Sequence, residues 1–265
     1  MSTETTNGSK AATMSPDSIG KPKELAPVND LRRYMDQMKS QIAVALPKHM
    51  NADRVSRLVL TEFSKSPKLQ LCNIKSIVAG VMTASQLGLE IGVGGQAFLI
   101  PYGKTATLVP GWKGLIDLNA RAGRSSVWTG AVFEGDTFRW ALGDSPFIKH
   151  QPCGENDPAK LQFAYAVGRI NGAEWPIIEC WPNARILKHR DKYNKVGKDH
   201  YSYTNWEMYA RKVVLLQVLK YLPKSIELQA AVDIAEREEE GRNLILDAEF
   251  ITIEPDSLPE PEEEK

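Results

Sequence analysis

The chain has 265 residues, 42% of them hydrophobic, and its formal net charge at pH 7 is zero. This length suffices for one sizeable core or two small ones, and no apolar run approaches the length of a membrane span. The first 30 residues are polar and contain no apolar stretch, so we expect no signal peptide. Three scattered cysteines, Cys72, Cys153 and Cys180, favour a reducing, cytoplasmic setting over a disulfide framework.

The zero net charge hides a strong segregation of charge along the chain. Residues 1–30 carry 3 basic and 4 acidic side chains, and residues 231–265 carry 3 basic and 13 acidic ones. Residues 31–230 hold 27 basic and 16 acidic side chains, a net charge of +11. A basic body with an acidic tail indicates a polyanion as partner, although a solvated surface with a solubilising tail gives the same asymmetry.

In chain order, the pattern predicts a disordered arm over residues 1–28 and then three helices with apolar positions at helical spacing. Each helix follows a side chain that can cap it: Asn29 or Asp30, Asn51 and Asn73. We expect the first helix to end before Pro47 and the third to end at Gly88.

Gly103-Lys104-Thr105 matches the end of a phosphate-binding P-loop, but its surroundings do not. The glycine required five positions before Gly103 is Phe98 in this chain. Short β-prone runs at Ala97–Ile100 and Thr105–Val109 flank the motif, so Lys104 is expected at a hairpin tip rather than at the start of a helix.

The rest of the chain predicts a meandering antiparallel sheet followed by a packed helix. Strand-like runs occur at Val127–Phe133, Thr137–Leu142, Leu161–Ile170 and Trp175–Trp181, the last two joined across Asn171-Gly172. Helical segments are expected at Trp112–Ala122, Asn183–Arg190 and Trp206–Leu222. The predicted fold class is α+β: an ordered domain over residues 29–230 and an acidic, disordered tail over residues 231–265.

Basic residues cluster in three places beside aromatic rings, as single-stranded nucleic acid requires. Cations neutralise phosphates, and flat rings stack bases at about 1–3 kcal/mol each. The densest cluster, within residues 185–198, precedes Tyr201, Tyr203 and Trp206. Candidate DNA contacts in the three places are Lys104, Trp112, Lys113, Arg121, Arg124, Lys188, Arg190, Lys192, Lys195, Lys198, Trp206, Arg211, Lys212 and Lys220.

Some of these residues have ordinary structural explanations. Asp117 can link Lys113 and Arg121 in surface ion pairs along one helix. Trp112 can be either a base platform or a core residue. The helix that carries Arg211 and Lys212 is otherwise nearly apolar all round, so its cations are expected to face an opening or a partner. Neither a metal-ligand pattern nor a known catalytic motif is found in the sequence.

Several ordered motifs closely resemble the phage and prophage RecT family of single-strand DNA annealing proteins. They cover roughly residues 30–230 and read SQLGLE at 85–90, AFLIPYG at 97–103, GWKGLIDL at 111–118, RAG at 121–123, AYAV at 164–167, WExYARK at 206–212 and KYLPKSIE at 220–227. Two departures stand out. The segment between Gly103 and Thr105 lacks a longer lysine-rich insert, and Trp112 stands where tyrosine is more usual.

The resemblance implies an ATP-independent protein that coats single-stranded DNA, anneals it to its complement and works as a ring or filament. It implies a curved antiparallel sheet with a long helix packed across it, related to the Rad-type and Redβ-like annealing proteins. No cofactor is required, with Mg²⁺ as a modulator of DNA binding. The implied partners are a RecE-like phage exonuclease and the host single-strand-binding protein. A metal-dependent nuclease and a passive DNA-binding scaffold remain as alternatives.

Overall fold

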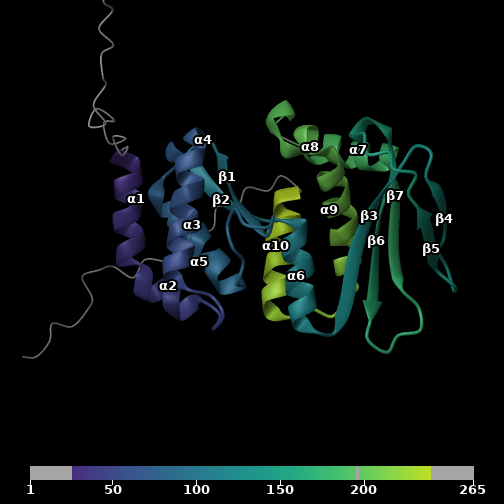
Figure 1. Cartoon of the computed structure of the whole chain (residues 1–265), viewed down its shortest axis with the longest axis horizontal. Coiled ribbons are helices and arrows are strands. Elements are labelled where there is room, and N and C mark those ends of the chain that lie inside the picture. The colour runs from purple at the N-terminus through teal and green to yellow at the C-terminus, as the bar shows by residue number, and fades with distance from the viewer. Residues whose placement is uncertain (1–25, 195–196, 240–265) are drawn as a thin grey trace, which may run out of the picture.

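The computed structural model describes residues 26–194 and 197–239 (Figure 1). Helices α1 to α5 form one end of the molecule, and the β4–β5 hairpin forms the other. Between them lie the β1–β2 hairpin, helices α6 and α10, helix α9 and a three-stranded sheet. Residues 1–25 of the predicted arm, residues 240–265 of the predicted tail and Lys195 lie outside the described residues.

The N-terminal helices are α1 (Ala26–Gln37), α2 (Lys39–Ala45), α3 (Ala52–Lys65), α4 (Pro67–Gln70) and α5 (Ile74–Leu87). The helix starts predicted after Asn51 and Asn73 are confirmed. The first start is wrong, because Asn29 and Asp30, the expected caps, lie inside α1, which also takes in the last residues of the predicted arm. The Asn51 side chain accepts hydrogen bonds from the first turn of α3, and Asn73 does the same for α5. These bonds satisfy amide groups that have no partner within the helix. The first predicted helix is divided into α1 and α2 at Met38.

The predicted hairpin is confirmed. Strands β1 (Ala97–Tyr102) and β2 (Thr105–Pro110) pair antiparallel, with Tyr102 opposite Thr105 across the tip. Gly103 has a φ of 61°, the left-handed conformation that glycine adopts readily. Because β2 rather than a helix follows Lys104, the structure excludes a P-loop here.

The single meandering sheet that we expected is wrong, because the strands form three separate sheets. Strands β3 (Ser125–Phe133), β6 (Leu161–Ile170) and β7 (Ile177–Pro182) pair antiparallel in the order β3-β6-β7. Strands β4 (Thr137–Ala141) and β5 (Phe147–Gln151) form a hairpin of their own between β3 and β6 in sequence. The sequence analysis missed β5, a short strand whose residues are mostly exposed.

Both faces of the three-stranded sheet are covered. Helix α9 (Trp206–Leu219) packs on one face, so close that a Cβ on Gly168 of β6 would lie 2.8 Å from Val218. The β4–β5 hairpin covers part of the other face, where Phe138 and Ile148 pack against a small cluster around Tyr165. Burying both faces explains why β6 reads as a nearly continuous apolar run.

Helix α10 (Ile226–Glu239) corrects the predicted domain boundary. Residues 231–239, assigned to the acidic tail, continue a packed helix whose buried side chains include Leu228, Val232 and Ala235. α10 lies against α5, β2, α9 and α6 (Trp112–Ala122), and so joins the two halves of the molecule. The remaining described elements are α7 (Asn183–Tyr193), α8 (Tyr201–Thr204) and 3₁₀ turns at Pro158–Lys160 and Gly197–Asp199.

Candidate nucleic-acid interface

The Trp112 ring has two cations near it, close to the start of α9. Lys113 Nζ is 5.7 Å from the ring centroid, and the Arg211 guanidinium carbon is 5.8 Å from it. The indole N–H points to the sulfur of Met208, 3.3 Å away. Trp112 is half-buried and packs against the main core, so it is both a core residue and the centre of this cluster. We call Trp112, Lys113 and Arg211 the Trp112 cluster.

Arg211 is held in place by two protein acceptors. Its Nη2 lies 2.6 Å from Glu207 Oε1, one turn earlier on α9, and its Nη1 donates to the carbonyl of Thr129 on β3 at 3.3 Å. Arg211 Nε and Thr129 Oγ1 are buried and have no hydrogen-bond partner among the described residues. The side chain as a whole is 24% exposed. A guanidinium that is held in place and partly exposed suits a phosphate oxygen.

A second cation-aromatic group connects α7 with the start of α9. The Arg190 guanidinium lies 4.4 Å from the Tyr203 ring centroid and 5.3 Å from that of Trp206. Trp206 donates its indole N–H to Asn183 at 3.2 Å and stacks on the buried Tyr209 ring at 5.7 Å. Trp206 is therefore mainly a packing residue, whereas Tyr203 is 42% exposed and presents the open ring.

The other predicted cations include exposed side chains and side chains that the fold holds in place. Lys104, Lys113, Lys188, Lys192 and Lys198 are exposed, and Lys192 lies 4.7 Å from the Tyr193 ring. Arg124 donates to the carbonyl of Lys224 at 2.9 Å, and Lys220 lies 3.3 Å from Glu236. Arg121 pairs with Asp117, as the helical spacing allowed, and also donates to the carbonyl of Gly88 at 2.9 Å. Arg121 and Arg124 are therefore held in place by backbone carbonyls of the fold.

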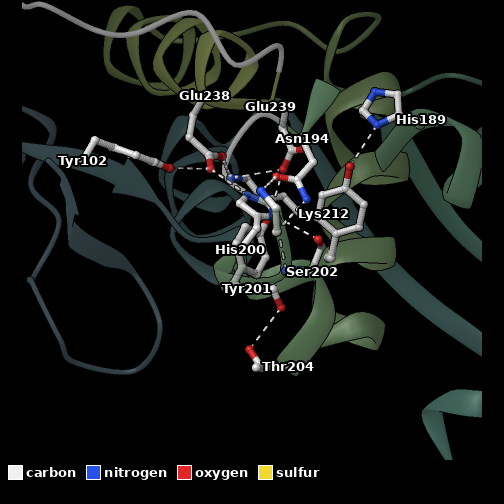
Figure 2. A network of polar contacts seen from close by, with 12 residues as sticks. Tyr102, His189, Asn194, His200, Tyr201, Ser202, Thr204, Lys212, Glu238 and Glu239 are labelled. Carbon is white, nitrogen blue, oxygen red and sulfur yellow. Dashed lines mark hydrogen bonds and ion pairs between the residues drawn. The ribbon is translucent and has the colours of Figure 1, made fainter. Parts of the chain in front are cut away.

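Lys212 does not face an opening, and its burial contradicts its predicted role in DNA contact. It is 3% exposed, and its Nζ lies 2.8 Å from Glu238 and 3.4 Å from Glu239 on α10 (Figure 2). Tyr102 donates to Glu238 at 3.2 Å, and Tyr201 donates to Glu239 at 3.0 Å. The apolar pattern of α9 correctly indicated a buried helix with a partner, but that partner is α10. We call these five residues the Lys212 network.

Burial and charge act in opposite directions on the two carboxyls of the network. Burial opposes ionisation of Glu238, but Lys212 and His200 outweigh it and lower the pKa of Glu238 below its usual range. Burial and the charge of Glu238 together raise the pKa of Glu239. Burial also raises the pKa of Tyr201. Glu238 is thus the ionised partner of Lys212.

Sequence reasoning overlooked a set of exposed residues on the sheet and the β4–β5 hairpin. Arg139 and Lys149 lie directly opposite each other on β4 and β5, and Trp128 on β3 is 42% exposed. The burial of β5 alternates, but its sequence FIKHQ does not, because two apolar residues are followed by three polar ones, so hydrophobic periodicity gives no signal for this strand. Within residues 26–194 and 197–239, no group of His, Cys, Asp and Glu side chains could hold a metal ion.

Comparisons with known proteins agree with the motifs. The model of the RecT family matches residues 53–246. The chain is 36% identical over 224 residues to Protein RecT of Escherichia coli (strain K12), an overlap that covers 79% of this chain and 81% of that protein. It is 29% identical over 218 residues to Uncharacterized protein YqaK of Bacillus subtilis (strain 168), covering 80% and 75%. The chain therefore belongs to the RecT family and is a single-strand annealing protein of DNA recombination.

Proposed function

We propose that the chain anneals complementary single strands by binding alone, without ATP, and that the Trp112 cluster holds the first strand. The observation that carries the proposal is the Trp112 ring with the cations of Lys113 and Arg211 at 5.7 and 5.8 Å from its centroid. Arg211 is oriented by Glu207 and Thr129, which lowers the entropy lost on binding a phosphate. The exposed lysines on α7 and the β1–β2 tip extend the positive surface along a bound strand.

We further propose that the protein assembles as a ring or filament with the N-terminal helices at the subunit interface. Val44 on α2 is 89% exposed, and Leu71, after α4, is 76% exposed. Helices α2 and α4 lie at the end of the molecule away from the three-stranded sheet (Figure 1). We propose as well that the fold is related to that of the Rad-type and Redβ-like annealing proteins. Helix α9, packed across an antiparallel sheet, supports this relationship. We also propose a RecE-like exonuclease and the host single-strand-binding protein as partners, and the bacterial cytoplasm as the place where the protein acts.

Complementary oligonucleotides labelled for energy transfer test the function. We expect rapid pairing without nucleotide, weaker at high salt, with Mg²⁺ changing the rate but not being required. Lys113→Ala should lower the slope of log affinity against log salt by about 0.7, one phosphate contact to a single strand. Lys48→Ala is the matched control, because Lys48 is an exposed lysine between α2 and α3.

No part of the described chain forms a helix able to cross a membrane.

Three results would contradict the proposal. Shortened strands in the presence of Mg²⁺ would indicate a nuclease, and binding without faster pairing would indicate a passive scaffold. Equal effects of Lys113→Ala and Lys48→Ala would show that the Trp112 cluster is not where the first strand binds.

A further inference from the structure

An open groove of about 370 Å³ lies beside β5 on the hairpin-covered face of the sheet. Its floor is formed by Tyr165 and Val167 of β6 and Ile178 of β7. Three aromatic rings line it: Trp128 of β3, Phe147 of β5 and Trp175 of the turn between β6 and β7. These rings are 42%, 37% and 49% exposed. Three large rings thus stay open to solvent in one groove, where packing could have buried them.

Arg169 of β6 is the arginine that lines this groove, and Glu174 is the carboxylate that lines it. Arg139 and Lys149 lie directly opposite each other on the hairpin, but on its outer face, because the residues that alternate with them pack toward the sheet: Phe138, Trp140 and Ile148. Open rings with an arginine beside them suit a stacked base and its phosphate.

The groove adjoins the Trp112 cluster across the edge of the sheet. Trp128 and Thr129 are consecutive on β3, so their side chains lie on opposite faces. The Thr129 carbonyl accepts a hydrogen bond from Arg211 on the α9 side, while Trp128 lines the groove on the hairpin side. β3 is an edge strand of its sheet, with α9 on one side and the hairpin on the other (Figure 1). One strand therefore carries residues of both sites.

We propose that the groove is a second site for single-stranded nucleic acid, which stacks the bases of the incoming strand on Trp128, Phe147 and Trp175. It rests on the proposed function, in which the Trp112 cluster holds the first strand. Annealing requires two strands to be sampled together, and two sites divided by the single strand β3 place them within a few residues of each other. The second strand is released from the rings as it pairs, because stacking without sequence preference is reversible.

The test separates first-strand binding from pairing. The double variant Trp128→Ala with Trp175→Ala should keep its affinity for one unpaired oligonucleotide within about twofold. Its annealing rate should fall about tenfold or more, and tenfold corresponds to about 1.4 kcal/mol. Trp140→Ala is the control: this ring lies on the same hairpin, is 36% exposed and packs against Phe163 rather than lining the groove. The Trp140→Ala variant should have a less stable hairpin and an unchanged annealing rate.

A crosslinking arm keeps the idea testable if annealing itself fails. An incoming strand carrying 5-iodo-deoxyuridine, added to protein loaded with a non-complementary first strand, should crosslink to peptides containing Trp128 or Trp175. Crosslinks at Trp112 or Trp206 only would overturn the second site, and so would unchanged annealing by the double variant, which would leave the groove to a peptide. Loss of first-strand affinity and annealing in parallel would show one continuous site instead of two.

Discussion

Replacing Lys212 with methionine separates its structural role from the DNA contact that the sequence predicts. Methionine keeps most of the side-chain volume but removes the charge that faces Glu238 at 2.8 Å and Glu239 at 3.4 Å. Two carboxyls would then share a buried site without a cation. Breaking a buried ion pair by removing one partner costs about 3–5 kcal/mol. At 2–4 °C per kcal/mol for a domain of this size, the melting temperature should fall by roughly 6–20 °C.

The loss should depend on pH in a defined direction. In the unmodified protein, the lowered pKa of Glu238 contributes stability above the ordinary glutamate range, and this contribution disappears as the pH falls through the folded pKa. In Lys212→Met, both carboxyls become harder to ionise in the folded state. The variant should therefore be most destabilised near about pH 8 and recover part of its stability near about pH 5, where the buried carboxyls take up protons.

Urea unfolding followed by circular dichroism at both pH values measures the effect. Lys220→Met is the matched control, because Lys220 links the same two helices through Glu236 at 3.3 Å but is 49% exposed. An exposed pair is worth about 0–1 kcal/mol, so this variant should unfold almost like the unmodified protein. The reasoning is refuted if Lys212→Met unfolds like Lys220→Met, or if it keeps its stability and loses affinity for single-stranded DNA.

Three further predictions concern local structure. Gly114→Ala should cost about 1–3 kcal/mol and lower the melting temperature, because a Cβ there would lie 2.2 Å from the carbonyl oxygen of Gln96; an unchanged melting temperature would contradict the packing of α6. Asn73→Ala should cost about 1 kcal/mol of unfolding free energy through the lost cap of α5, and a value near zero would argue against the cap. A thiol reagent should label Cys153 in the folded protein and leave the buried Cys180, whose pKa burial raises to about 12, unmodified; mass spectrometry that finds label on Cys180 would contradict its burial.

The elements that the sequence predicts correctly are specified by neighbours a few residues apart. The caps at Asn51 and Asn73, the left-handed glycine at the end of α5 and the tip at Gly103 all use backbone and side-chain groups within one or two turns. Helix α6 was predicted with the same bounds, because Gly123 closes an amphipathic segment. Local hydrogen bonds and local backbone preferences decide these features, so a single sequence suffices to find them.

The features that sequence reasoning missed depend on distant partners. The last turn of α10 reads as an acidic tail until Glu238 is seen against Lys212, 26 residues away in the chain. The contacts of Arg121 with the carbonyl of Gly88 and of Arg211 with the carbonyl of Thr129 cannot be read from spacing, because both acceptors lie far away in the chain. A charge count cannot distinguish a buried, paired lysine from an exposed one, since burial is a property of the packed helices.

The position of α10 at the end of the described chain also bears on synthesis. β2, α5 and α6 leave the ribosome long before the helix that covers them, and Lys212 emerges before Glu238. At about 5–20 residues per second, the 26 residues from Lys212 to Glu238 take roughly 1–5 s to translate. During this interval the nascent chain carries an uncovered apolar surface and an unneutralised lysine. A chaperone that binds exposed apolar segments has its clearest opportunity then, and a premature stop before α10 would leave both halves unjoined.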